Sequence, residues 1–246
     1  MVFSTPIFLF YFLALTLLVY YLVPRKGRNV VLLISSLFFY YWGEREYVAI
    51  MFLSTAIDYV HGLLVERCKA RDNDRGARMA VASSIVFNLA LLLFFKYWDF
   101  LAASLQAVGL TFMPVLNIHL PIGISFYTFQ TMSYTIDVYR GDTRAQRSII
   151  NFGTFVTLFP QLIAGPIIKY KDLGDQIDQR TCSTDKFASG VQTFMVGMAK
   201  KVLIANNVGM LWESYKAMAL GELTVAGSWL GVLAFTFQIY FDFSGY

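Results

Sequence analysis

Long runs of apolar residues, separated by short polar or basic segments, dominate the pattern of hydrophobic and polar positions along the chain. Runs of roughly 18 to 20 apolar residues are long enough to cross a hydrocarbon layer of about 30 Å as helices. Helix is favoured because an isolated strand leaves backbone groups unpaired in lipid, and the alternation typical of a membrane barrel is not seen. The pattern therefore predicts an all-α, polytopic membrane protein. The predicted apolar segments are 2–23, 29–42, 47–65, 79–97, 120–139, 151–168, 187–212 and 223–246.

Composition supports this interpretation and argues against nucleic acid as a partner. The chain is 57% hydrophobic and 15% charged, whereas a soluble domain carries about 25% charged residues. The net charge of +4 arises from Lys and Arg gathered in short loops beside apolar runs, which is the placement that orients membrane proteins. Cys68 and Cys182 lack metal-ligand or CxxC spacing, so we expect free thiols and no metal site.

Basic loops predict the orientation of the chain in the membrane. The segments 25–28, 66–78 and 140–147 carry clusters of Lys and Arg, and the positive-inside rule places such segments in the cytoplasm. The first apolar run has neither a basic region before it nor a small-residue cleavage site after it. It is therefore expected to stay as a first span rather than to be removed as a signal peptide. The result is a multi-pass protein with its N-terminus outside.

The sixth apolar segment is predicted to enter and leave the membrane on the same side. Lys169 and Lys171 follow it immediately, so both of its ends carry the charge expected of the cytoplasmic side. Pro160, Gly165 and Pro166 interrupt it, and a proline removes a backbone donor and clashes with the preceding helical turn. A re-entrant hairpin satisfies both observations. Its non-helical backbone requires surrounding protein or a water-filled cavity.

Charged residues inside the later segments are candidates for function. Lys200 and Lys201 lie near the middle of the predicted helix 187–212, and a cation at the bilayer centre costs at least about 2.5 kcal/mol. The two side chains therefore line an aqueous vestibule, bind an anion, or lie near the cytoplasmic surface on a tilted helix. Asp242, which lies among aromatic residues next to Ser244, is by itself an ambiguous buried carboxylate.

The remaining ionisable residues of the apolar segments favour structural interpretations. Asp58 and His61 are three residues apart and share a helix face, which indicates a polar pair near the cytoplasmic end of a span. Asp137 and Arg140 have the same spacing at a helix end and are expected to form an interfacial ion pair. His119 belongs to a residue type that serves as a general base, but its place at the external interface favours an interfacial side chain. The motifs of soluble hydrolases, nucleotide-binding proteins and zinc peptidases are absent from the sequence.

Four stretches along the chain carry a resemblance to a known family. They are LPIGISFYTFQ at 120–130 with DVYRG at 137–141, FPQLIAGP at 159–166, the segment 197–205 around the paired lysines, and IYFDFSGY at 239–246. Together they resemble the membrane-bound O-acyltransferase (MBOAT) family, specifically its bacterial alginate O-acetyltransferase type. The resemblance covers essentially the whole chain. It implies a helical bundle around a central funnel, in which an acyl group from a cytoplasmic donor reaches an acceptor on the outer side.

The same resemblance implies the substrates, partners and lining residues. The co-substrate is an acetyl or acyl thioester, with no bound cofactor, and the acceptor is an exported polysaccharide such as alginate. The partners are the membrane and periplasmic acetylation proteins, and the location is the bacterial inner (plasma) membrane. The funnel or donor cavity is expected to be lined by Ser125, Gln130, Pro160, Gln161, Gly165, Pro166, Lys200, Lys201 and Asp242.

The catalytic residue of the family is not expected within this chain. The family's invariant histidine lies in a Trp-His motif downstream of the stretch at 239–246, and therefore beyond Tyr246. Neither His61 nor His119 follows a tryptophan. We therefore expect residues 1–246 to be the N-terminal portion of a single transmembrane domain, truncated at its C-terminus and inactive alone. The alternatives are a membrane transporter or channel subunit, and an inactive membrane remnant.

Cysteine accessibility tests the predicted orientation. Cys68 and Cys182 both lie in basic loops, so a membrane-impermeant thiol reagent is expected to label them only from the cytoplasmic face. The measurement compares labelling in right-side-out and inverted vesicles. Labelling of either cysteine in intact right-side-out vesicles contradicts the predicted topology.

Overall fold

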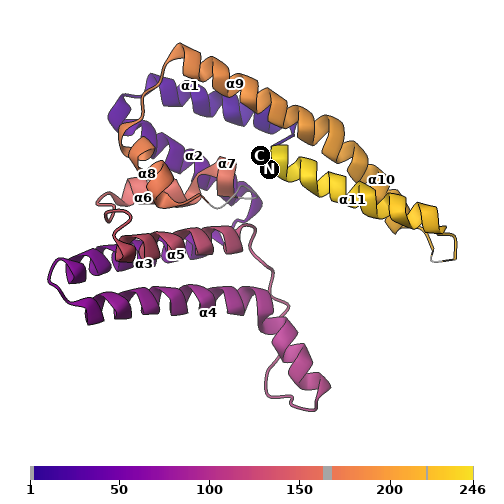
Figure 1. Ribbon diagram of the computed structural model, residues 1–246, viewed down its shortest axis with the longest axis horizontal. Helices are drawn as coiled ribbons and strands as arrows, with labels where there is room; N and C mark the ends of the chain where they lie inside the picture. The colour runs from indigo at the N-terminus through magenta and orange to yellow at the C-terminus, as the bar shows by residue number, and fades with distance from the viewer. Residues whose placement is uncertain (1–2, 163–167, 220, 246) are drawn as a thin grey trace. The chain divides into compact units, whose positions relative to one another are not determined.

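The computed structural model describes residues 3–162, 168–219 and 221–245. Within these ranges the regular structure is helical and contains no strand (Figure 1), which confirms the predicted all-α class. The chain divides into a first unit, residues 14–180, and a second unit, residues 3–13 with 181–245. Each unit has its own internal packing. The expectation of a single transmembrane domain over the whole chain stays a prediction.

The helices of the first unit follow the predicted apolar segments closely. The segment predicted at 47–65 forms a helix at Val48–Lys69, and the one predicted at 120–139 forms a helix at Ile124–Arg140. The elements of this unit are α1 Ala14–Leu22, η2 Arg25–Gly27, α2 Arg28–Gly43, α3 Val48–Lys69, α4 Asp74–Ala107, α5 Ile124–Arg140, α6 Ile149–Thr157, α7 Phe159–Leu162 and α8 Tyr170–Gln179.

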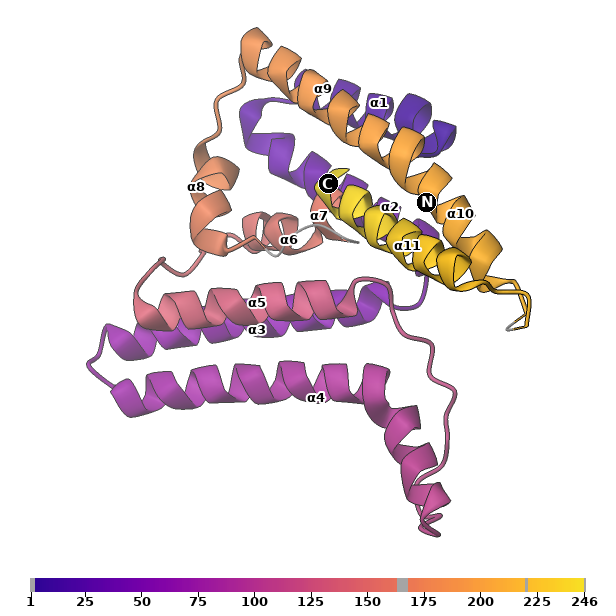
Figure 2. The same ribbon diagram turned by 45° about the vertical axis from the view of Figure 1, so that its right-hand side comes forward.

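Helices α3, α4 and α5 lie side by side and form the centre of the first unit (Figure 2). An aromatic cluster joins them to α6 and α8: the Tyr134 ring is 4.5 Å from that of Phe152 and 5.0 Å from that of Tyr170, measured between centroids. Phe155 completes the cluster, with its ring 4.9 Å from Tyr170. Aromatic pairs at these distances add stabilisation beyond their buried area, so the cluster fixes α6 and α8 against α5.

Two described helices, α3 and α4, are long and apolar enough to cross a membrane. Helix α4 exposes large apolar side chains along its length, among them Val86, Leu93 and Phe100. Water would make such a surface unfavourable, whereas lipid makes it compatible with a stable fold. The exposed face of α4 therefore fits contact with hydrocarbon.

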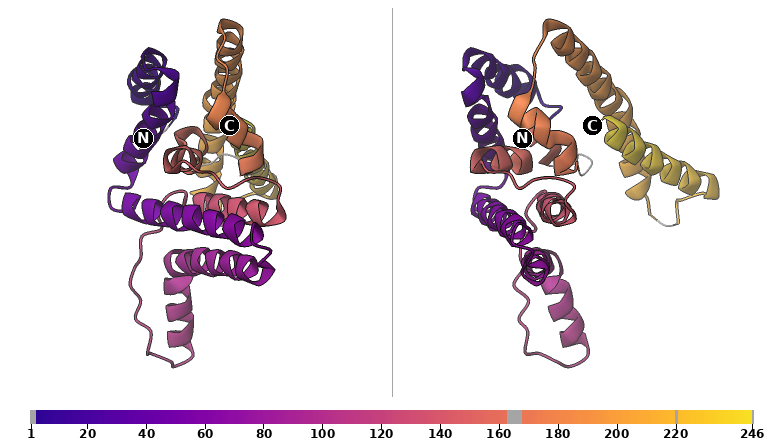
Figure 3. Two further views of the ribbon diagram at one scale, coloured as in Figure 1. Left: turned by 90° about the vertical axis from the view of Figure 1, so that its left-hand side faces the viewer. Right: turned by 60° about the vertical axis from the view of Figure 1, so that its left-hand side comes forward.

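The C-terminal part of α4 turns away from the axis of the rest of the helix (Figure 3). The helix continues only to Ala107. Gly109 ends it in the left-handed region, with φ of 90°, and Leu110 N–H donates to the Leu105 carbonyl at 2.9 Å. This pattern is a Schellman ending, in which glycine is favoured because it lacks a Cβ.

The irregular segment after α4 is held by one carboxylate. Asp99 accepts hydrogen bonds from the backbone N–H groups of Leu116 at 2.8 Å, Asn117 at 3.2 Å and Ile118 at 2.7 Å. The indole N–H of Trp98 donates to the Pro114 carbonyl at 3.1 Å. These contacts fix the approach of the chain to α5.

The second unit consists of a long helical run beside α11 (Figure 3). The predicted helix 187–212 is continuous, but its middle has the wider turn of a π-helix over Lys200–Ala205. The run approaches α11 closely at Gly197. A Cβ added there would collide with the Gly245 carbonyl oxygen. The elements of this unit are η1 Ile7–Leu13, α9 Thr184–Ala199, η3 Lys200–Ala205, α10 Asn206–Lys216 and α11 Val225–Gly245.

Candidate functional site

The predicted interruption of the sixth apolar segment is present in the structure. Helix α6 ends at Thr157, Leu158 leaves helical geometry with ψ of 111°, and α7 starts at Phe159. Pro160 occupies the first turn of α7, where its missing N–H removes no intrahelical bond. The Phe159 N–H is satisfied by the Ser36 hydroxyl on α2 at 3.1 Å. Gly165 and Pro166 lie outside the described residues, so the re-entrant hairpin stays a prediction.

Two of the predicted lining residues meet at this interruption. Gln130 on α5 and Gln161 on α7 both donate through Nε2 to the Phe155 carbonyl, at 2.9 and 2.8 Å. Both side chains are buried. The last carbonyls of a helix have no intrahelical partner, so the glutamines satisfy a backbone group that the early end of α6 leaves open. Ser125 is half-buried on α5, and Pro160 is exposed.

A buried carboxylate lies between α3 and α4. Asp58, fully buried, accepts hydrogen bonds from the Ser84 hydroxyl at 2.6 Å and from Asn88 Nδ2 at 3.0 and 2.8 Å to its two oxygens. No ion pair involves Asp58 among the described residues. A buried polar group is tolerated when hydrogen bonds replace those lost from water. Ser84 and Asn88 supply these bonds.

Asp58 and His61 share one face of α3, as their spacing predicts, but each has its own hydrogen-bond partners. The His61 ring contacts the Ile57 carbonyl at 2.8 Å through Nδ1 and the Ser83 hydroxyl at 2.9 Å through Nε2. Both residues of the supposed pair therefore face α4, as their shared helix face indicates, but they have separate partners there. Both ring nitrogens of His61 are engaged in packing contacts.

The expected ion pair of Asp137 with Arg140 is wrong. Asp137 is 4% exposed while Arg140 is exposed to solvent, and no ion pair joins the two within the described residues. A helical spacing of three places two Cβ atoms on one face, but long side chains can then point apart.

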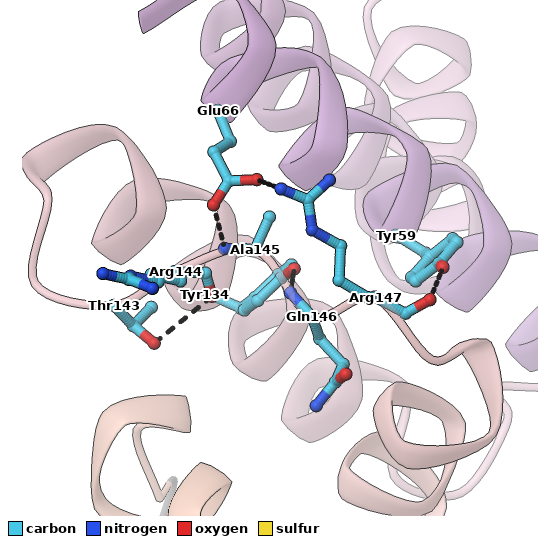
Figure 4. Close-up of polar contacts among 8 residues, drawn as sticks. All are labelled: Tyr59, Glu66, Tyr134, Thr143, Arg144, Ala145, Gln146 and Arg147. Carbon is cyan, nitrogen blue, oxygen red and sulfur yellow. Dashed lines mark hydrogen bonds and ion pairs between the residues drawn. The ribbon is translucent and has the colours of Figure 1, made fainter. Parts of the chain in front are cut away.

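Residues 143–147, which follow α5, are fastened to α3 (Figure 4). Glu66 accepts a hydrogen bond from the Ala145 N–H at 3.2 Å and forms an ion pair with Arg147. The Tyr59 hydroxyl donates to the Arg147 carbonyl at 2.6 Å. Arg147, predicted only as a topology signal, thus also closes the end of the bundle.

Gln146 extends this connection to α8. Its N–H donates to the Tyr134 hydroxyl at 2.9 Å (Figure 4), and its Nε2 donates to the Tyr170 hydroxyl at 2.7 Å and to Asp178 at 3.1 Å. Burial raises the pKa of Tyr170 to about 12. The Tyr170 phenol therefore stays neutral near pH 7.

The remaining predicted site residues come together in the second unit. Lys201 on η3 forms an ion pair with Asp242 on α11, and Lys200 Nζ donates to the Ser244 carbonyl at 3.1 Å. All three predicted side chains are half-buried. The π-helical turn lets consecutive lysines both reach α11, and such turns frequently occur at functional sites. Whether these residues line a donor cavity stays a prediction.

His119 pairs with a glutamate that sequence reasoning did not single out. Glu44, whose side chain is 6% exposed, lies 3.5 Å from Nε2 of the largely exposed His119 and accepts a hydrogen bond from the Ile122 N–H at 3.3 Å. The Tyr47 ring lies 5.8 Å from the His119 ring. The arrangement holds the start of α5 against the end of α2. The interfacial position of His119 stays a prediction.

No catalytic residue is expected between Met1 and Tyr246. The structure describes α11 as far as Gly245, and Tyr246 lies outside the described residues. Of the two histidines, His61 is engaged on both ring nitrogens and His119 is paired with Glu44. The placement of the family's Trp-His motif beyond Tyr246 therefore stays a prediction, and no catalytic role is assigned to either histidine.

No family model matches the sequence. Among curated proteins, the probable alginate O-acetylases of Azotobacter vinelandii and Pseudomonas aeruginosa are each 44% identical to this chain over 100% of its length, which is 49% and 47% of theirs. The chain is therefore similar over its whole length to alginate O-acetylases. This confirms the resemblance carried by the sequence motifs.

A more distant relative has another polymer in its name. The peptidoglycan O-acetyltransferase of Helicobacter pylori is 27% identical over 100% of this chain and 52% of its own length. The chain thus spans about half the length of the curated relatives it matches. These relatives and the two long apolar helices α3 and α4 together support a membrane location for the chain.

At the Asp58 site, we expect removal of one polar partner to destabilise the protein more than removal of both. Asn88→Leu leaves both Asp58 oxygens short of a donor, and we expect a loss of roughly 1–3 kcal/mol of stability. Asp58→Leu combined with Asn88→Leu removes both polar partners and should recover part of that loss. The measurement is the thermal unfolding midpoint in detergent, with the exposed Asn207→Leu as control. A double variant no more stable than Asn88→Leu contradicts this account of the site.

Proposed function

We propose that the full-length protein containing this chain is a membrane O-acyltransferase, which transfers an acetyl group from a cytoplasmic thioester donor toward an exported polysaccharide such as alginate. The observation that carries the proposal is the 44% identity, over the whole chain, to proteins named as probable alginate O-acetylases. The lower identity of 27% to a peptidoglycan O-acetyltransferase makes peptidoglycan the second candidate acceptor.

The interrupted helix at α6 and α7 supports a cavity within the membrane. Non-helical backbone at membrane depth needs protein or water around it, and Gln130 and Gln161 satisfy the Phe155 carbonyl there. Helix α7 also presents the exposed Pro160. We infer that Ser125, Gln130, Pro160 and Gln161 line a funnel toward the reacting groups, together with Gly165 and Pro166.

The lysine pair suits the recognition of an anionic donor. In the second unit Lys201 is held by Asp242, and Lys200 donates to a backbone carbonyl. Each ammonium uses one such contact and keeps further donors, because the group has three. We infer that Lys200 and Lys201 bind the anionic part of the donor. Anchoring of η3 against α11 is the alternative role.

The reaction requires a base, which we place outside these residues. In the proposed step the acceptor hydroxyl oxygen forms a bond to the acyl carbon, the bond from that carbon to sulfur breaks, and a histidine takes the hydroxyl proton. His61 is engaged on both ring nitrogens, and His119 is paired with Glu44. The family's Trp-His motif, beyond Tyr246, supplies the base in this proposal.

The proposed location follows from the basic loops. We infer a multi-pass protein of the bacterial inner membrane with its N-terminus outside, so that the donor is taken from the cytoplasm and the acetyl group is delivered outward. Delivery to the polysaccharide then requires partner proteins in the periplasm.

Acetyl transfer by the purified full-length protein tests the function. With a radiolabelled acetyl thioester and alginate, together with the periplasmic fraction, we expect label in the polymer. Label only in peptidoglycan selects the second acceptor. Absence of label in either polymer, with an intact and folded protein, contradicts the proposal.

Replacement of the lysine pair tests its donor role. Lys200→Ala with Lys201→Ala in the full-length protein should lower kcat/KM for the donor at least about tenfold, which corresponds to ~1.4 kcal/mol. The measurement is donor turnover per molecule of folded protein. Lys216→Ala is the matched control, because Lys216 pairs with Glu213 on an exposed face of the same unit. A fall in protein level without a change in turnover per molecule assigns the pair to anchoring instead.

A further inference from the structure

A cavity of about 420 Å³ lies in the first unit, between the turn that joins α1 to α2 and the end of α8. Its lining includes Asn151 of α6, but none of the residues that we expect to line the funnel. Basic residues dominate its wall. The charged residues of the lining are Arg25, Lys26, Arg28, Asp178 and Arg180.

The charges around this cavity are unbalanced. Its carboxylate, Asp178, accepts hydrogen bonds from Asn151 Nδ2 at 2.7 Å and Gln146 Nε2 at 3.1 Å. No ion pair of Arg25, Lys26 or Arg180 occurs among the described residues. The cavity therefore has an excess of positive charge.

One tyrosine holds two of the guanidinium groups. The carbon at the centre of the Arg28 guanidinium lies 5.0 Å from the centroid of the Tyr20 ring, and that of Arg180 lies 5.1 Å from it. Arg180 Nε also donates to the Tyr20 hydroxyl at 2.5 Å. Stacking on an aromatic face orients the planar guanidinium. Two like charges on one ring repel each other, and a bound anion relieves that repulsion.

The walls of the cavity are fixed by the neighbouring elements. Asn29, at the start of α2, donates through Nδ2 to Asn151 Oδ1 at 2.8 Å and to the Ile177 carbonyl at 3.0 Å. This asparagine joins α2, α6 and α8. Arg28 and Arg180, which are 152 positions apart in the chain, are therefore held together by tertiary structure. Membrane orientation alone requires no such convergence, because it depends on the loop charges only.

We propose that this cavity binds a phosphate group at the membrane surface. Arginine forks match the oxygens of a phosphate through paired N–H donors. The phosphate comes either from the headgroup of an anionic phospholipid or from a soluble phosphate compound. The lipid source is favoured because α1 exposes Leu18 and Leu22 next to the turn, where acyl chains of a bound lipid find an apolar surface.

Lipid binding to the purified full-length protein tests the proposal. Fluorescently labelled phosphatidylglycerol is titrated in detergent, and Arg28→Gln with Arg180→Gln is expected to raise Kd at least about tenfold. Arg71→Gln with Arg75→Gln is the matched control, because it removes the same charge from exposed positions. We expect the control to change Kd less than about twofold.

The second variant and the competitors make each outcome decisive. Arg28→Lys with Arg180→Lys keeps the charge but loses the planar guanidinium fork, so lipid binding should weaken even where the glutamine variant does not fold.

Competition by inorganic phosphate or pyrophosphate, with no preference for the lipid, assigns the site to a soluble compound. Tight phosphatidylglycerol binding without such competition assigns it to the lipid. Equal binding by wild type and the folded lysine variant overturns the proposal. Acetyl transfer is not used as a readout, so the proposed function and this inference fail separately.

Discussion

The need to satisfy buried polar groups inside the protein governs this structure, because hydrocarbon offers them no partner. Asp58 obtains its donors from Ser84 and Asn88 on the neighbouring helix. The Phe155 carbonyl at the end of α6 obtains two glutamine donors. These hydrogen bonds join α3 to α4 and α5 to α6, so each one also ties neighbouring helices together.

The same requirement explains how Lys200 and Lys201 are accommodated without either charge facing lipid. Lys201 and Lys200 would be costly in hydrocarbon, but an ion pair to Asp242 and a contact to the Ser244 carbonyl direct both toward α11. The close approach of the helices at Gly197 brings these groups within reach. Compensation within the unit and recognition of a donor are compatible, because an ammonium has three donors.

Sequence periodicity predicted the helices well and their polar partners poorly. Apolar length placed α3 and α5, and Pro160 marked the end of α6, because both signals are local. The partners of Asp58 lie 26 and 30 positions away, and spacing within one helix cannot identify them. The spacing of three within one helix therefore predicted an ion pair of Asp137 with Arg140 that does not form in the described residues. Ser84 and Asn88, polar residues four apart in an apolar run, were the available signal for the missed site.

The cationic cavity differs from the sites of Asp58 and Glu66 in how its charges are balanced. Between α3 and α4, Asp58 has protein hydrogen-bond partners, and at the end of α3 Glu66 forms an ion pair with Arg147. At the turn between α1 and α2, arginines from distant parts of the chain converge around one tyrosine, in a cavity whose basic side chains outnumber its carboxylate. The charge of this cavity is not balanced by its own carboxylate, and in our proposal a ligand supplies the balance. An anion at the membrane surface has the charge and the location that this excess requires.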